Sequence, residues 1–280
     1  MAEKETGSLY LVATPIGNLG DISARAAQTL RDVDFIAAED TRVTRKILEH
    51  LNIKKPLVSY YEHNRRESGE KIISRIRSGE SCALVTDAGT PGISDPGEDL
   101  VRLCVGSDIP MLVVPGPCAA VSALTLSGFA AGRFSFEGFL STSRKSRFEH
   151  LDELKTEKRT MVFYEAPHKL LRTLRDMQSV FGDRNISISR ELTKVFEETM
   201  RCTLPDAVAH FENTPPRGEF VIVIEGAAAA PHERPNLEDA LAAADIYIRD
   251  GLSVKDAVKK AADETGVPKN SLYNAVVRKD

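Results

Sequence analysis

Short apolar segments alternate with segments of helical spacing over roughly the first 120 residues, and this alternation restricts the fold more than any other feature. The apolar segments contain few polar positions, which is typical of strands buried on both faces of a parallel sheet. They are Ser8–Ala13, Val33–Ala38, Leu57–Tyr60, Cys82–Val85 and Met111–Val114. We therefore predict a parallel α/β domain with right-handed crossover connections.

Glycine and proline are concentrated at three of the predicted strand ends, in Thr14–Gly20, Asp87–Gly97 and Pro115–Pro117. The carboxyl ends of parallel strands share one edge of the sheet, where open α/β proteins bind ligands, so we expect the three loops to border one cleft. None of them has the GxGxxG or Walker pattern, so the usual dinucleotide and triphosphate sites lack their signature. A purely structural connection is the alternative for the central loop, although its length exceeds that of most such loops.

The pattern changes after Phe129, where segments with polar alternation replace continuous apolar ones. The expected strands are Phe134–Leu140, Thr160–Tyr164, Asn185–Glu191 and Glu219–Glu225, with a helix over Lys169–Phe181 and with Val195–Thr203 as an edge strand or hairpin partner. They predict a second, mixed α/β domain.

Four regions follow from these patterns. We place a first domain at residues 1–117, a second at 118–226, a linker at 227–236 and a helical region at 237–280. Pro231 and Pro235 prevent one continuous helix through the linker. The three short amphipathic helices that fit the last region are Leu237–Arg249, Ser253–Thr265 and Lys269–Val277.

Composition narrows the class of protein. The 280 residues are 42% hydrophobic, with no apolar run of membrane-spanning length and no signal-peptide pattern in the first nine residues, so we expect a cytosolic protein without a membrane partner. The four cysteines have no metal-ligand spacing, and no metal site is expected. The net charge of −4 is no global nucleic-acid signature, but Ser141–Arg190 carries eleven Lys and Arg against seven Asp and Glu.

Several short motifs lie at the predicted strand ends, namely Ala13–Asp21, Ala37–Arg42, Val85–Gly97, Pro115–Pro117, Tyr164–His168 and Arg190–Lys194. Together they resemble the tetrapyrrole methylase superfamily and, within it, the ribosomal RNA small subunit methyltransferase I family. The resemblance covers about Ser8 to Gly226, and we expect it to extend into the helical region. It implies two α/β domains with S-adenosylmethionine in the cleft between them, and a homodimer. The implied activity is 2′-O-methylation of a cytidine ribose in the decoding region of small-subunit ribosomal RNA, as naked RNA or in the assembled small ribosomal subunit.

S-adenosylmethionine has no phosphates, which agrees with Gly-rich strand ends that lack a Walker or Rossmann signature. It requires carboxylate or carbonyl partners for its amine and ribose, which suits Asp87, and amides for its carboxylate, which suits the helix start at Cys118 and Ala119. We expect Asp87–Ile93 to contact it, and Ser94–Gly97 mainly to turn the chain into the next helix with Ser94 or Asp95 as N-cap. The candidate contacts are Pro15, Gly17, Asp87, Ala88, Gly89, Thr90, Ile93, Pro117, Cys118, Ala119, Tyr164 and Glu219.

Methyl transfer from a sulfonium requires the protein mainly to hold the nucleophile and the methyl group in line. A ribose hydroxyl is a poor nucleophile, so a general base, or a cation that stabilises the developing oxyanion, should help. The candidates are Lys194, Glu191, Arg42 and Glu39, of which Lys194 is our first choice. A salt bridge or a helix cap explains each of them equally well.

Two basic clusters are candidates for RNA phosphate contacts: His63, Arg65 and Arg66, and Arg144, Lys145 and Arg147. A solvated helix face explains the second cluster equally well. The region from Leu237 onward carries seven Lys and Arg against eight Asp and Glu, so charge does not nominate it as an RNA module.

Two other functions are open at this stage. The same fold methylates tetrapyrroles and protein side chains, so fold alone does not choose the acceptor. A non-catalytic protein that binds RNA or senses a small molecule would also retain the cleft.

Overall fold

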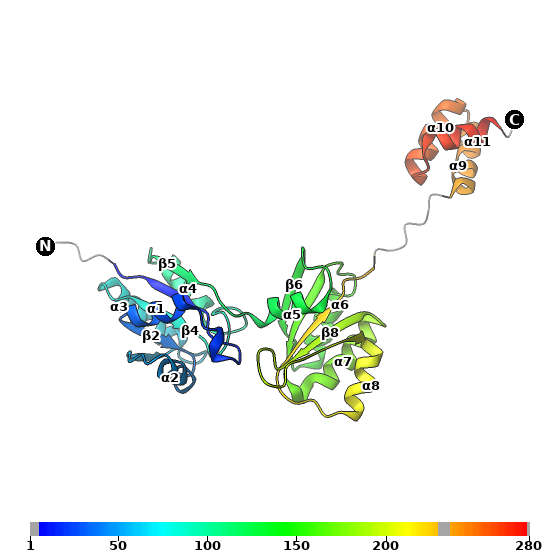
Figure 1. The fold of residues 1–280 in the computed structure, drawn as a ribbon. Helices are drawn as coiled ribbons and strands as arrows, with labels where there is room; N and C mark the ends of the chain where they lie inside the picture. The colour runs from blue at the N-terminus through cyan, green and yellow to red at the C-terminus, as the bar shows by residue number, and fades with distance from the viewer. Residues whose placement is uncertain (1–5, 229–235, 279–280) are drawn as a thin grey trace. The chain divides into compact units, whose positions relative to one another are not determined.

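The computed structural model describes residues 6–228 and 236–278, and the chain forms two compact units, residues 1–227 and 228–280 (Figure 1). In the described residues, the first unit contains two five-stranded sheets with helices and the second contains three helices. The expected α/β fold class is thereby confirmed. The domain limits proposed within the first unit stay predictions, and residues 229–235 of the proposed linker lie outside the described residues.

The first sheet is parallel, with the strand order β3-β2-β4-β1-β5. Its strands are β1 (Leu9–Val12), β2 (Phe35–Ala38), β3 (Leu57–Ser59), β4 (Cys82–Val85) and β5 (Met111–Val114). Each strand lies within one of the five apolar segments of the sequence, so these predictions are confirmed.

Helices cover both faces of this sheet. They are α1 (Ala24–Asp32), α2 (Thr41–His50), α3 (Arg65–Arg77) and α4 (Glu98–Val105), with a short 3₁₀ turn η1 (Leu19–Asp21). Successive strand residues point to opposite faces: Ile36 packs in a core cluster with residues of α1 and α2, and its neighbour Phe35 packs with residues of α3 and α4. Both faces are therefore buried, which explains why the strands have no polar alternation.

Helix α4 begins later than the sequence predicts. Its N-cap residue is Gly97, and neither Ser94 nor Asp95 caps it. Ser94 has a φ of 63°, in the left-handed region, and this turn keeps both residues in the loop after β4. The N-cap prediction was therefore wrong, and the loop carries Asp95 to a different place from the one expected.

The second sheet is mixed, with the order β6-β7-β10-β8-β9, in which only β6 and β7 pair in parallel. Its strands are β6 (Phe134–Phe139), β7 (Thr160–Glu165), β8 (Asn185–Arg190), β9 (Glu198–Thr203) and β10 (Phe220–Ile224). The helices are α5 (Ala119–Ser127), α6 (Arg144–Glu153), α7 (Pro167–Phe181) and α8 (Leu204–Asn213). Val162 packs with α5, and its neighbours Met161 and Phe163 pack in the cluster on the other face with α6, α7 and α8.

Helix α8 is the element that the sequence reasoning missed. It begins directly after β9 with a capping box, in which Thr203 and Asp206 satisfy each other's backbone amides. Pro205 lies in its first turn, where proline is tolerated. These signals are present in the sequence, but the helix was missed because it follows the preceding strand at Thr203 without an intervening loop.

The second unit consists of α9 (Leu237–Arg249), α10 (Val254–Thr265) and α11 (Lys269–Val277), as the sequence predicts. Ser253 caps α10, and Gly266, with a φ of 70°, ends it in a left-handed turn that leads into α11. Ala240, Val258 and Leu272, one from each helix, belong to its own buried core. In the described part of the chain, no helix is long and apolar enough to cross a membrane.

Candidate active site

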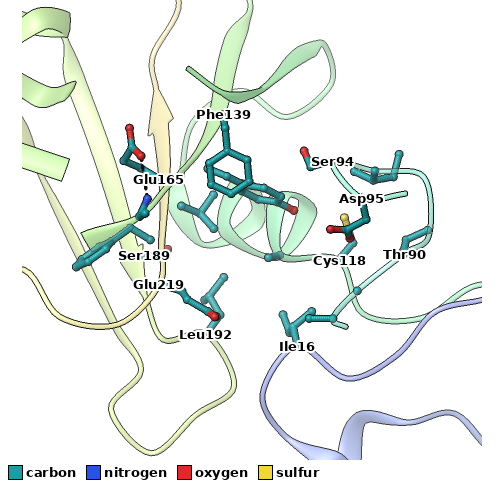
Figure 2. Close-up of a pocket in the computed structure, with 18 of the residues that line it drawn as sticks. Ile16, Thr90, Ser94, Asp95, Cys118, Phe139, Glu165, Ser189, Leu192 and Glu219 are labelled. Atoms are coloured by element: carbon teal, nitrogen blue, oxygen red, sulfur yellow. Dashed lines mark hydrogen bonds between the residues drawn. The ribbon is translucent and has the colours of Figure 1, made fainter. Parts of the chain in front are cut away.

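A cavity of about 310 Å³ lies within the first unit, between loops of the first sheet and strand ends of the second (Figure 2). Ser94, Asp95 and Cys118 line one side of it and face Phe139, Leu192 and Glu219 on the other. Of the candidate cofactor contacts, those that line it are Ala88, Gly89, Thr90, Ile93, Cys118, Ala119, Tyr164 and Glu219. Those that do not are Pro15, Gly17, Asp87 and Pro117.

The three Gly/Pro loops of the first sheet are tied together beside the cavity. Thr14 and Gly89 exchange backbone hydrogen bonds of 2.9 and 3.1 Å, which joins the loops after β1 and β4. The Thr90 hydroxyl donates to the carbonyl oxygen of Pro117 at 3.2 Å, which joins the loops after β4 and β5. Gly89 has a φ of 84°, which glycine adopts without strain. These hydrogen bonds hold the three loops side by side, as predicted.

Asp95 is the acidic residue of the central loop that lines the cavity, and sequence reasoning missed it. Burial raises the pKa of its carboxyl to about 7, and the negative charges of Glu39 and Asp87 raise it further. This carboxyl is therefore partly protonated at neutral pH, and a cation in the cavity would favour its ionised form. We expected Ser94–Gly97 mainly to turn the chain, but Ser94 and Asp95 both line the cavity.

Asp87 does not line the cavity. Its Oδ1 accepts a hydrogen bond from the backbone amide of Asp40 at 3.1 Å, which links the ends of β2 and β4. Burial raises the pKa of the Asp87 carboxyl. In this structure Asp87 therefore acts on the site through the loop and the field around Asp95.

Tyr164 forms an aromatic wall at the start of α5. Its hydroxyl accepts a hydrogen bond from the backbone amide of Ala120 at 3.1 Å, and its ring contacts Phe136 and Phe139 edge to face. Burial raises the pKa of the Tyr164 hydroxyl to about 12, so this group stays protonated. The wall offers an apolar surface for a flat ring.

Neither Lys194 nor Glu191 lines the cavity, but Lys194 forms an ion pair with Glu219, which does, and we call this place the mouth of the cavity. Its Nζ is 2.9 Å from Glu191 Oε1 and 2.9 Å from Glu219 Oε2. Burial alone would lower the pKa of the Lys194 ammonium, but the hydrogen bonds to Glu219 and Glu191 outweigh it and raise the pKa. Lys194 is therefore a fixed cation at neutral pH and is unsuited to act as a general base. The hydrogen bond from Lys194 in turn lowers the pKa of the Glu191 carboxyl.

Gly17 allows Lys194 to reach this position. A Cβ atom on Gly17 would lie 2.5 Å from Cγ of Lys194, so only glycine leaves room for the lysine stem. Gly17, a candidate cofactor contact, thus packs against Lys194, a candidate catalytic residue that lies 177 positions later in the chain.

The other two catalytic candidates, Glu39 and Arg42, lie at the end of β2 and do not line the cavity. Arg42 Nη2 is 2.6 Å from Asp40 Oδ2, and the arginine side chain is 85% exposed. Burial raises the pKa of Glu39, and the negative charge of Asp87 raises it further. The structure therefore does not bring these residues together with Lys194 in one cluster of contacts.

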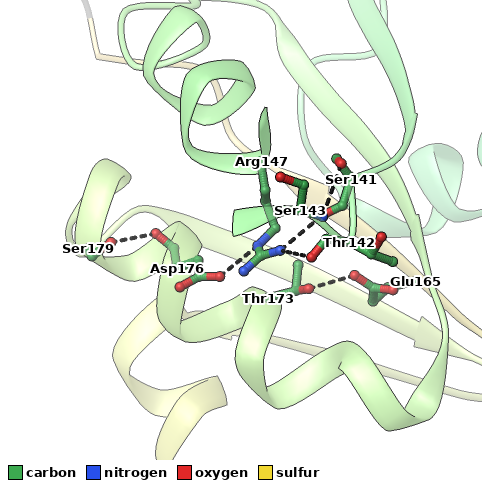
Figure 3. Close-up of polar contacts among 8 residues, drawn as sticks. All are labelled: Ser141, Thr142, Ser143, Arg147, Glu165, Thr173, Asp176 and Ser179. Carbon is green, nitrogen blue, oxygen red and sulfur yellow. Dashed lines mark hydrogen bonds and ion pairs between the residues drawn. The ribbon is translucent and has the colours of Figure 1, made fainter. Parts of the chain in front are cut away.

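The basic cluster at the start of α6 divides into buried and exposed members. Arg147 is buried, and its Nε donates to Asp176 Oδ2 at 2.7 Å (Figure 3). Its Nη1 donates to the carbonyl oxygens of Ser141 and Thr142. Arg147 therefore fastens the loop before α6 to α7, and its assignment as an RNA contact was wrong. Sequence could not show this, because the partner lies 29 positions away.

The remaining basic candidates are exposed, namely His63, Arg65, Arg66, Arg144 and Lys145. Arg65 forms an ion pair with Asp99 at 2.8 Å, and Lys145 is 3.8 Å from Glu149. Exposed pairs of this kind contribute little to stability, so their cations remain available to an anionic partner. In the described residues, no cluster of His, Cys, Asp or Glu could hold a metal ion.

Comparison with known proteins identifies the class. Residues 8–208 match the family Tetrapyrrole (Corrin/Porphyrin) Methylases, and residues 237–279 match the RsmI C-terminal HTH domain. Among solved structures, the cobalt precorrin-4 methyltransferase CbiF aligns with a TM-score of 0.60 at 16% identity, over 78% of this chain and 94% of that one. A uroporphyrin-III C-methyltransferase from Thermus thermophilus, complexed with S-adenosylhomocysteine, aligns with a TM-score of 0.56 at 17% identity, over 78% and 97%. The first unit thus has the tetrapyrrole methylase fold.

Relatives of higher identity define the family more narrowly. Proteins named ribosomal RNA small subunit methyltransferase I are 47% identical in Synechocystis (95% of this chain, 96% of the relative), and 45% identical in Pseudomonas aeruginosa (98% of each). The chain belongs to the ribosomal RNA small subunit methyltransferase I family. One relative of that name, from Thermotoga maritima, is 47% identical over 220 residues, which are 99% of its own length but 79% of this chain.

Proposed function

We propose that this protein transfers the methyl group of S-adenosylmethionine to the ribose 2′-hydroxyl of a cytidine in the decoding region of small-subunit ribosomal RNA. The observation that carries the proposal is the cavity, which combines an apolar wall, ionisable carboxyls and Gly-rich loops without a phosphate-binding pattern. The names of the relatives, at 41–47% identity, support the class of acceptor.

The residues around the cavity fit this cofactor. Asp95 and Glu219 would hold its positively charged and hydroxylated parts, and the start of α5 at Cys118 and Ala119 would face its carboxylate. Tyr164 and Phe139 would flank its adenine. When bound, S-adenosylmethionine supplies a methyl group whose bond to sulfur breaks as the bond to the ribose oxygen forms.

Lys194 would stabilise the negative charge that develops on the ribose oxygen, because it is a fixed cation at the mouth of the cavity. Glu191 and Glu219 would hold its ammonium in place, and Gly17 would leave room for its stem. The proton of the hydroxyl would leave to water or to a carboxylate at the mouth. Arg42 and Glu39 would contribute through the field at the end of β2.

Exposed cations would bring the RNA to this mouth. Arg65, Arg66, Arg144 and Lys145 are solvent-accessible, and phosphate contacts of this kind make binding depend on salt. His63 lies beside the first pair and would join it.

We further propose a homodimer that involves the edge strand β5. No other strand of the described residues pairs with its outer side, and Leu112 and Val113 are 47% and 56% exposed. Exposed apolar residues on an edge strand favour association. Analytical ultracentrifugation of Val113→Lys should then show monomers, and Ile246→Lys, a similarly exposed residue of α9, is the matched control.

The direct test uses S-adenosylmethionine with a labelled methyl group. It is incubated with the protein and, separately, naked small-subunit RNA, assembled small subunits and a uroporphyrinogen-type tetrapyrrole, and the label is then mapped. We expect the label on one cytidine ribose of the RNA. Label on the tetrapyrrole or on a ribosomal protein would show that this molecule, and not RNA, is the acceptor. No transfer to any of them would favour a non-catalytic role.

A further inference from the structure

The loop that follows β8 presents two apolar side chains to solvent beside the cavity. Val195 is 94% exposed and Phe196 is 70% exposed, whereas Leu192, earlier in the same loop, is buried and lines the cavity. Large apolar side chains at such exposure on an ordered segment usually mark a contact surface. We call Val195 and Phe196 the apolar tip.

The loop is held in one conformation. The backbone amide of Thr193 donates to Glu197 Oε2 at 2.7 Å, and the amide of Glu197 donates back to the carbonyl oxygen of Lys194 at 3.1 Å. Glu191 and Thr193 have φ values of 52° and 67°, which side chains adopt only when surrounding contacts compensate for the strain. The loop therefore holds the apolar tip outward instead of letting it collapse onto the protein.

The cavity has the size of a site for one small molecule. Its volume of about 310 Å³ lies at the lower end of the range of about 300–1,000 Å³ that is usual for small-molecule sites. One molecule the size of S-adenosylmethionine fills such a space. A nucleotide that reacts with it would lie at the mouth of the cavity, where Lys194 forms an ion pair with the cavity-lining Glu219 and is followed directly by the apolar tip.

The charge at this mouth favours a base over a phosphate. Lys194 is flanked by two carboxylates, Glu191 and Glu219, so the cluster carries net negative charge. Such a cluster gives a phosphate group no net attraction and does not oppose an aromatic base. An aromatic ring beside it offers a stacking surface, which is how single-stranded RNA bases are usually held by proteins.

We propose that Phe196 is a stacking platform for an unpaired RNA base at the mouth of the cavity, supported by Val195. This inference rests on the proposed function, because it requires an RNA acceptor. Phe196 would hold the acceptor nucleotide, or its neighbour, so that the ribose hydroxyl reaches the methyl group. The exposed cations at Arg144 and Lys145 bind phosphates, and the platform positions a base, so the two contributions differ in their dependence on salt.

The test uses the absence of tryptophan from the sequence. Phe196→Trp keeps an aromatic ring and introduces a single tryptophan, whose fluorescence is quenched when a base stacks on it. The full-length variant is titrated with whichever substrate the wild-type protein methylates, naked small-subunit RNA or assembled small subunits. We expect quenching that saturates with RNA and near wild-type kcat/KM.

Phe196→Leu is the matched variant, because it keeps an apolar side chain and removes the ring. We expect kcat/KM for RNA to fall about 10-fold, with unchanged affinity for S-adenosylmethionine and an unchanged slope of log affinity against log salt. A wild-type kcat/KM in Phe196→Leu, or no change in the tryptophan fluorescence of Phe196→Trp while RNA is bound, would overturn the platform.

Two further outcomes separate this inference from its alternatives. If Phe196→Leu changes the sedimentation coefficient of the protein without RNA, the apolar tip contacts a second copy and the platform is rejected. If the wild-type protein methylates no RNA at all, the proposed function itself is wrong. If the wild-type protein methylates RNA but substitutions of Phe196 have no effect, only the stacking platform is wrong.

Discussion

Asp95 shows how a single residue couples stability to ligand binding. Its carboxyl has a pKa of about 7, because burial and the charges of Glu39 and Asp87 oppose ionisation. Between about pH 4 and pH 7, the folded protein retains a proton that the unfolded chain has lost. The free energy of unfolding therefore falls as pH rises through this window.

We predict opposite effects of Asp95→Asn on stability and on cofactor binding. The amide carries no charge to desolvate, so the variant should unfold at a higher temperature than wild type at pH 8 and at nearly the same temperature at pH 4. Its affinity for S-adenosylmethionine should fall about 10-fold or more, because an ionised partner is lost. Thermal unfolding and calorimetric titration at both pH values measure the two effects. Unchanged affinity at pH 8 would remove Asp95 from the cofactor site.

Gly17 and Lys194 should behave as one unit. Because a Cβ on Gly17 would lie 2.5 Å from Cγ of Lys194, Gly17→Ala must displace the lysine stem. We predict that Gly17→Ala and Lys194→Met each lower kcat by about 10- to 100-fold, with much smaller effects on cofactor affinity. Gly132→Ala, which has open space around its added Cβ, is the control. If the double variant loses the sum of both effects, the two residues act independently.

At the residue scale, the sequence predicted the Gly-rich wall of the cavity and Glu219, but it missed Asp95. Ala88, Gly89 and Thr90 follow a parallel strand directly, so turn chemistry and topology suffice to place them. The position of Asp95 depends on a left-handed turn at Ser94. No local sequence pattern predicts such a turn at this residue, which is not glycine.

At the scale of elements, helix α6 separates structural charge from charge available to RNA. Arg147 and Asp176 form a buried ion pair that joins the loop before α6 to α7, whereas Arg144 and Lys145 are exposed on the same helix. The three residues look alike in the sequence. Only the packing of α7 against α6 distinguishes them.

We predict that Arg147→Gln lowers the free energy of unfolding by about 3–5 kcal/mol, because Asp176 loses its buried partner. Its salt slope for RNA binding should equal that of wild type at a temperature where it is folded. The paired variant Arg144→Ala and Lys145→Ala should show the reverse pattern, with unchanged stability and a flatter salt slope. Urea unfolding and RNA titrations from low to high salt measure both. A flatter slope in folded Arg147→Gln would contradict this division.

The sequence predicted helices and strands correctly where their apolar residues recur with a clear period or where loops separate them from their neighbours. The continuous apolar segments of β1 to β5 have a single interpretation once helices alternate with them, and α9 to α11 have clear caps and spacing. Helix α8 was missed because it follows β9 at Thr203 without a loop, so its capping box lay at the end of a strand pattern.

At the scale of the whole molecule, the second unit is compact by itself. It has its own core, built on Ala240, Val258 and Leu272, and the described residues that line the cavity belong to the first unit. Sequence periodicity predicted three helices here, but their charge balance gave no function.

We predict that a chain ending at residue 228 retains cofactor binding and methyl transfer but has a KM for RNA at least about 10-fold higher, because a tethered second contact is lost. The surface of α11 supports an RNA contact: Lys269, Asn270, Asn274 and Arg278 are exposed, and the helix contains no acidic residue. In the full-length protein, Lys269→Ala with Arg278→Ala should reproduce part of the rise in KM and leave kcat unchanged. Calorimetry with S-adenosylmethionine and steady-state kinetics on RNA measure these effects. A truncated chain with the KM of wild type would assign the second unit to a role outside substrate binding, and a truncated chain that no longer binds the cofactor would show that the first unit depends on it to fold.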